Sequence, residues 1–161
     1  MTPKGVRDST GFILLALFCL SGDAAPLQGR VIGVLDGDTI SLIDHDHRSL
    51  RIRLAQIDAP EKHQPFGAAS KQSLSSLVFG KVVLIDIVDT DRYGRSVAKI
   101  HIDEMDVNLE QGRRGMAWVY EKYARESHYF SVQLEAKKER RGLWKDQDPT
   151  PPWTYRHNTK K

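Results

Sequence analysis

The sequence has almost no cysteine. Its one cysteine, Cys19, lies inside an apolar stretch near the N-terminus, and the residues before it, Leu17 and Phe18, are too large for a lipidation site. A disulfide needs two cysteines, and structural zinc sites of the thiolate type need several. The composition therefore excludes an internal disulfide and a cysteine-based zinc site. If the N-terminal stretch is removed, it excludes a thiol nucleophile as well.

The apolar stretch from Phe12 to Leu20 falls short of the ~20 residues that a membrane-spanning helix needs. Basic residues precede it and small residues follow it: Lys4, Arg7, Gly22, Ala24 and Ala25. This order is typical of a secretory signal peptide. We expect a signal peptide over residues 1–24, a secreted or periplasmic protein, and no stable membrane association after processing. An uncleaved N-terminal anchor is the alternative.

The chain also lacks a strong charge of either sign. Its 24 Lys and Arg residues against 21 Asp and Glu residues give a formal net charge of +3 and a pI of about 9.0. Such a balance suits an anionic partner but is too small to identify one. The positions of individual charged residues must therefore carry the functional argument. The length of 161 residues suits one domain and favours a monomer.

Short β-rich segments follow Pro26. A hairpin turns at Asp36–Gly37, and residues 50–54 alternate strictly between apolar and charged side chains. The predicted strands are 31–35, 39–42, 50–54, 81–88 and 97–102, and the predicted helices are 68–78, 107–111 and 127–142, the last with Phe130 and Leu134 inward. This order predicts an α+β, mainly β fold: a five-stranded OB-fold Greek-key barrel with about three helices. The domain would span residues 25–145, and residues 146–161 would form a flexible basic tail.

The alternation of the third strand slips at Ala55–Gln56. Ile57 should return to the core, yet it has the wrong parity for the face that carries Leu54. One extra residue, a β-bulge, would restore the register and place Asp58 on the same side as Arg53. A loop could have the same effect.

Three charged clusters stand out in this framework. They are Asp36-Gly37-Asp38-Thr39, then Arg53-Leu54-Ala55-Gln56-Ile57-Asp58-Ala59-Pro60-Glu61, then Asp91-Arg92-Tyr93-Gly94-Arg95. Each cluster alone has an ordinary explanation as a turn, a strand end or a solvated hairpin. In this order and spacing, they resemble the staphylococcal nuclease family over roughly residues 31–144.

The resemblance implies a calcium site. Asp38 and Asp58 would bind Ca²⁺ directly, the backbone carbonyl of Ala59 would add a ligand, and Glu61 would lie one water away as the general base. Oxygen ligands in a loose shell are what calcium prefers, and a phosphodiester needs positive charge on its oxygens and a positioned water.

The resemblance also implies a phosphate clamp and a base-binding surface. Arg53 and Arg95 would hold the phosphate with planar, permanently charged side chains. Tyr93, Trp118 and Tyr120 would contact the substrate. The family commonly has Tyr-x-Tyr before its last helix, and this chain has Trp118-Val119-Tyr120 instead. The phenol at the first position is lost, although an indole can still stack on a base.

The function implied is that of a secreted, calcium-dependent endonuclease acting on DNA and RNA, with a preference for single-stranded or breathing regions. It would leave 5′-hydroxyl and 3′-phosphate ends. The alternative is a non-catalytic OB-fold module of the same ancestry that only binds nucleic acid or protein. The five charged residues Asp38, Arg53, Asp58, Glu61 and Arg95 are all present. This favours the enzyme, because a degenerate module would be expected to have lost at least one of them.

Overall fold

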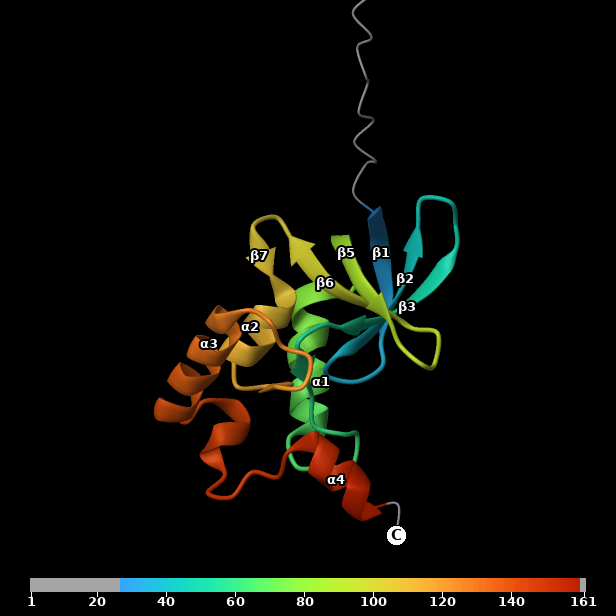
Figure 1. Ribbon diagram of the computed structural model, residues 1–161. Helices are drawn as coiled ribbons and strands as arrows, with labels where there is room; N and C mark the ends of the chain where they lie inside the picture. The colour runs from blue at the N-terminus through green and yellow to red at the C-terminus, as the bar shows by residue number, and fades with distance from the viewer. Residues whose placement is uncertain (1–26, 160–161) are drawn as a thin grey trace, which may run out of the picture.

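The computed structural model of the protein describes residues 27–159, so the predicted signal peptide lies outside the described residues. Five strands close into a mixed barrel in the order β3-β2-β1-β5-β6, with β3 and β6 pairing in parallel to complete it. The helices pack below one end of this barrel (Figure 1). The prediction of a mainly β, five-stranded OB-type barrel is confirmed.

The elements follow the predicted order closely. The strands are β1 (Leu27–Val34), β2 (Thr39–Asp44), β3 (Ser49–Leu54), β4 (Ile57–Asp58), β5 (Val82–Thr90), β6 (Ser96–Ile102), β7 (Met105–Asp106) and β8 (Trp118–Val119). The helices are α1 (Gly67–Val78), α2 (Val107–Arg113), α3 (Ser127–Lys138) and α4 (Pro152–Thr159), with a 3-10 turn η1 (Gly142–Lys145). None of the helices among residues 27–159 is long and apolar enough to cross a bilayer.

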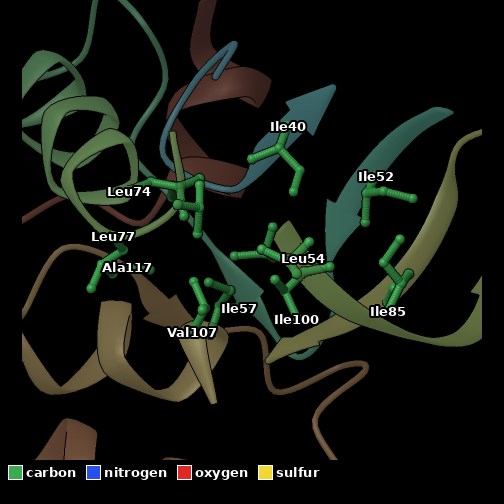
Figure 2. Packing of buried hydrophobic residues seen from close by; sticks show 14 of the residues in the cluster. Ile40, Ile52, Leu54, Ile57, Leu74, Leu77, Ile85, Ile100, Val107 and Ala117 are labelled. Atoms are coloured by element: carbon green, nitrogen blue, oxygen red, sulfur yellow. The ribbon is translucent and has the colours of Figure 1, made fainter. Parts of the chain in front are cut away.

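The core fills the barrel and continues beneath it to the helices. Ile52 and Leu54 of β3 point into the core, as their alternation predicts, and Leu74 of α1 belongs to the same buried cluster (Figure 2). Each of these three side chains is fully buried. Burying one aliphatic side chain of this size contributes about 1.5–3 kcal/mol, so this packing fixes the strands that carry the charged clusters.

The buried face of α3 differs from the predicted one. Phe130 and Leu134 are exposed, whereas Tyr129 and Gln133 are buried. The Tyr129 hydroxyl donates to Asp106 Oδ2 at 2.8 Å, and Gln133 Oε1 accepts the backbone N–H of Val119 at 2.8 Å. These two side chains can be buried because each has a hydrogen-bond partner, which hydrophobicity alone does not indicate.

The C-terminal segment also differs from the flexible tail that the sequence analysis expects. Residues 152–159 form α4, which makes four helices among the described residues rather than about three. Trp153 stacks on Tyr120, and Gln64 Nε2 donates to the carbonyl of Thr150 at 2.6 Å. The prolines and basic residues of this segment suggest disorder, but its aromatic side chain has a surface to pack against.

Candidate active site

The Asp36–Thr39 turn presents two carboxylates at one end of the barrel. Asp36 Oδ1 accepts the backbone N–H of Asp38 at 3.1 Å, and the Thr39 hydroxyl donates to Asp38 Oδ1 at 3.1 Å. Burial, together with the nearby charge of Asp38, raises the pKa of Asp36 to about 6. Asp38 is itself buried. The turn therefore holds two carboxylates close together and largely away from solvent, so positive charge beside them would be favourable.

Gly37 lets this turn approach α1 closely. A Cβ atom at position 37 would overlap the Ser70 hydroxyl and the side chain of Ala59. Ser70 is held in place because its hydroxyl donates to the carbonyl of Met116 at 2.6 Å. The Gly37 carbonyl in turn accepts from Gln111 Nε2 at 2.8 Å. Helices α1 and α2 thus hold the turn from below.

Gly37→Ala should displace the turn and lower both stability and activity. Overpacking of this kind destabilises by about 1–3 kcal/mol, and a shift of the Asp38 carboxylate disturbs the site directly. Denaturant unfolding and a nuclease assay measure the two effects. The matched control is Gly112→Ala in α2, where the nearest atom to the new Cβ is Val132 Cγ2 at 3.6 Å. Wild-type stability and activity in both variants would show that the close packing of Gly37 against Ser70 and Ala59 is not needed to hold the turn.

The break in the apolar alternation at Ala55–Gln56 is a two-residue turn between β3 and β4 rather than a β-bulge. Gln56 has a left-handed backbone with φ of 66°, and its side-chain oxygen accepts the backbone N–H groups of Arg125 and Glu126 at 2.9 and 3.1 Å. Its own carbonyl accepts the N–H of Tyr120 at 2.8 Å. The chain after α2 therefore holds the strained residue in place.

This turn brings Asp58 to the same side as Arg53, as the parity argument predicts. Arg53 Nη2 lies 2.9 Å from Asp58 Oδ1 and 3.3 Å from Asp38 Oδ2. Arg53 Nη1 donates to the carbonyls of Leu54 at 2.6 Å and Ile57 at 2.8 Å. A single guanidinium thus joins the two predicted metal ligands and ties together both sides of the turn.

Asp58 is nearly inaccessible to solvent, with its side chain 3% exposed. Burial raises the pKa of Asp58, and the nearby charge of Asp38 acts in the same direction, while hydrogen bonds from Arg156 and the charge of Arg53 oppose the rise. Asp38 Oδ2 also accepts the backbone N–H of Ala59 at 2.6 Å. Two carboxylates this close and this buried need a positive partner.

Glu61, in the loop that follows β4, contacts the same arginine as Asp58, which is Arg156. Its carboxylate Oε1 lies 2.7 Å from Arg156 Nη1, and Arg156 Nη2 lies 2.7 Å from Asp58 Oδ2. Glu61 is more open than Asp58, with its side chain 38% exposed. Asp58 and Glu61 therefore share one cation, which shows that both carboxylates point toward a single position where positive charge is held.

Comparison with known proteins identifies the family. A family profile described as staphylococcal nuclease homologue matches residues 51–146. The chain belongs to the staphylococcal nuclease family. It is 46% identical over 149 residues to an uncharacterized endonuclease of Escherichia coli O157:H7, covering 91% of this chain and 97% of that protein. It is 33% identical to a micrococcal nuclease of Shigella flexneri, covering 84% of each chain, and 36% identical to protein ParB of Escherichia coli, covering 90% and 88%.

Among the predicted site residues of this staphylococcal nuclease-like domain, Arg95 makes no ion pair with Asp38, Asp58 or Glu61. Arg95 directly precedes β6, and its Nε lies 2.7 Å from Asp91 Oδ2 within the same hairpin. Asp91 also accepts the N–H groups of Tyr93 and Arg95, and these contacts lower the pKa of Asp91 although partial burial opposes the shift. Tyr93 is 73% exposed, and the guanidinium of Arg95 lies 5.7 Å from the centre of its ring.

The aromatic residues before α3 form a group with two tryptophans from the C-terminal part of the chain, Trp144 and Trp153. Trp118 meets Trp144 edge-to-face at 4.4 Å and Trp153 at 5.7 Å between ring centres. Tyr120 is stacked on Trp153, with ring centres 5.3 Å apart and planes only 3° from parallel. The ring of Trp153 therefore covers part of the predicted base-binding surface formed by Trp118 and Tyr120.

Sequence reasoning missed two residues that shape this site. Gln111 is fully buried. Its Nε2 donates to the carbonyl of Gly37 in the turn, and its Oε1 accepts from the Ser73 hydroxyl at 2.6 Å. Arg156 was assigned to a flexible tail but contacts Asp58 and Glu61. A buried Gln inside a predicted helix is a weak signal of polar partners, whereas no local pattern marks Arg156.

Proposed function

We propose that this protein is an exported, calcium-dependent endonuclease that acts as a monomer and hydrolyses phosphodiester bonds of DNA and RNA. It would prefer unpaired strands and leave 5′-hydroxyl and 3′-phosphate ends. Membership of a nuclease family and the endonuclease named among its relatives support the reaction class. The convergence of Asp58 and Glu61 on one cation, with Arg53 beside them, is the observation that carries the proposal.

The residues present fit a hard cation. Every side-chain donor turned toward the shared position is a carboxylate oxygen, and the guanidinium of Arg156 marks where a cation is held. No group of three or more acidic, histidine or cysteine side chains in residues 27–159 is placed to hold a metal unaided. Asp38, Asp58 and the carbonyl of Ala59 would hold the ion together with water, and oxygen ligands of this kind are what calcium prefers.

The chain supplies the remaining chemistry. Bound calcium would place positive charge against the phosphate oxygens. Glu61 is the only one of the three carboxylates that is partly open to solvent, so it can hold a water and accept its proton. Arg53 lies beside this position and can stabilise charge on the phosphate as it develops. Arg95 would join it after leaving Asp91.

Activity should require calcium and vanish in chelator. Oxygen ligands and only two direct carboxylates favour calcium over softer metals, and magnesium demands stricter octahedral geometry. The measurement is hydrolysis of denatured DNA by the purified protein with calcium, with magnesium, and with excess chelator. Full activity in chelator would contradict the metal assignment, and no hydrolysis under any condition would favour the non-catalytic binding module.

Export should yield a mature chain that begins near Ala25. The apolar stretch and the small residues after it form a cleavable signal in our interpretation. Mass spectrometry of the protein recovered from periplasm and medium measures the new N-terminus. Recovery of only the full-length chain from the cytoplasm would contradict the proposal.

A further inference from the structure

We propose that the C-terminal segment, residues 146–159, is an autoinhibitory element that occupies the catalytic carboxylates and the base-binding surface of this protein until substrate and metal displace it. The proposal rests on the function proposed above. In Figure 1 the helix of this segment, α4, lies beside the loop that precedes α1. The same loop carries Glu61.

Arg156 engages the two acidic groups on which the reaction depends. Its Nη1 donates to Glu61 Oε1 at 2.7 Å and to Asp58 Oδ1 at 3.2 Å, and its Nη2 donates to Asp58 Oδ2 at 2.7 Å. Carboxylate oxygens that accept hydrogen bonds from Arg156 are not free at those positions to hold a metal ion or to accept a hydrogen bond from an attacking water. A metal ion at the same position would meet the positive charge of Arg156 at close range. This pose is therefore incompatible with catalysis, and Arg156 is not a catalytic residue in it.

Trp153 engages the aromatic surface at the same time. It lies flat against Tyr120 and meets the edge of Trp118. Aromatic side chains that stack on nucleobases contribute about 1–3 kcal/mol per base. A base cannot stack on the face of Tyr120 that Trp153 covers. One turn of α4 thus presents an aromatic ring and a cation to the two surfaces that a nucleotide with its metal ion would use.

Two further contacts position the segment. Gln64 Nε2 donates to the carbonyl of Thr150 at 2.6 Å, and the hydroxyl of Tyr155 donates to the carbonyl of His63 at 3.2 Å. Both partners belong to the loop after Glu61. The segment is therefore aligned with the carboxylates by specific hydrogen bonds rather than by the charge of Arg156 alone.

The segment is held weakly enough to be displaced. Pro152 is the only buried residue of α4, and an isolated helix of this length is marginal in water. The side chain of Arg156 remains 36% exposed. Prolines before and at the start of α4 separate it from η1, so it can leave without disturbing the barrel. The contacts of Arg156 and Trp153 make the covered state the major population. A ligand that binds only the uncovered state therefore binds with a correspondingly weaker apparent affinity.

Isothermal titration of calcium into the purified protein tests the proposal without relying on activity. If the segment covers the site nine-tenths of the time, Arg156→Ala should lower the apparent dissociation constant for calcium about tenfold. Arg156→Lys keeps the charge but not the two-pronged geometry, so it should fall between wild type and Arg156→Ala. The matched control is Lys138→Ala, which removes one exposed cation of α3 that has no carboxylate partner within residues 27–159.

Equal calcium affinity in wild type and Arg156→Ala, or weaker affinity in the variant, would overturn the autoinhibitory role and leave the proposed function standing. Absence of calcium binding in every variant would overturn the metal assignment and this inference with it. Trp153→Ala loosens the segment without removing a partner of the carboxylates. If Arg156→Ala failed to fold, the same tightening of calcium binding should appear in Trp153→Ala, and its absence there would overturn the proposal.

Discussion

Glu61→Gln should lower kcat by about 10²–10⁴-fold, the usual contribution of a positioned general base. Glutamine keeps the size and shape of glutamate but cannot accept a proton from water. The side chain is partly exposed, and its one side-chain partner in the structure is Arg156, so the barrel should be unaffected. The Michaelis constant should change little, because the interaction lost is one made in the transition state.

Steady-state kinetics on a short single-stranded oligonucleotide measures this effect, with circular dichroism and the melting temperature as the check on folding. Glu104→Gln, in the exposed turn between β6 and β7, is a matched control and should retain full activity. The double variant Glu61→Gln with Arg156→Ala should be as inactive as Glu61→Gln alone, since releasing the C-terminal segment cannot replace the missing general base. A folded Glu61→Gln variant with wild-type kcat would contradict the role of Glu61.

Arg53→Ala should abolish most activity and also destabilise the fold. Loss of a donor to the developing phosphate charge lowers kcat by about 10²–10³-fold. The guanidinium is only 13% exposed and is shared by Asp58, Asp38 and two backbone carbonyls. Breaking a buried ion pair by removing one partner costs about 3–5 kcal/mol.

Arg53→Lys separates these two effects. An ammonium group can compensate the charge of Asp58 but cannot reach both carbonyls of the turn, so part of the stability should return while activity stays low. Urea unfolding and oligonucleotide hydrolysis provide the two readouts. Arg51→Ala, two residues away on the exposed face of β3, is the matched control and should change neither. An Arg53→Ala protein as stable as wild type would show that the buried carboxylates do not depend on this arginine.

Local patterns were sufficient to predict the barrel. The alternation at residues 50–54 and the Asp36–Gly37 turn predict β2 and β3, because side chains in a strand alternate between two faces and turns need particular residues. The same parity argument predicts that Asp58 returns to the side of Arg53, which the ion pair confirms. It did not predict that a left-handed Gln56, held by Arg125 and Glu126, makes the correction.

Polar partners distant in sequence decided what local patterns could not. Hydrophobicity ranks Phe130 and Leu134 above Tyr129 and Gln133 as buried residues of α3, yet the polar pair is buried because Asp106 and Val119 offer hydrogen bonds. Such partners become visible only when the elements are packed together.

The sequence by itself determined the strands of the barrel, the three charged clusters and the family, since strand alternation and turn residues are local signals and the order and spacing of the clusters are visible in the chain. Only the tertiary structure decided which cation lies between Asp58 and Glu61. Arg156 is 95 residues from Glu61 in the chain, and its own neighbourhood of prolines and basic residues is typical of a solvated tail. Arg156 reaches the site because Trp153 stacks on Tyr120 and the carbonyl of Thr150 accepts a hydrogen bond from Gln64. Contacts between residues so far apart in the chain leave no periodic signal in the sequence.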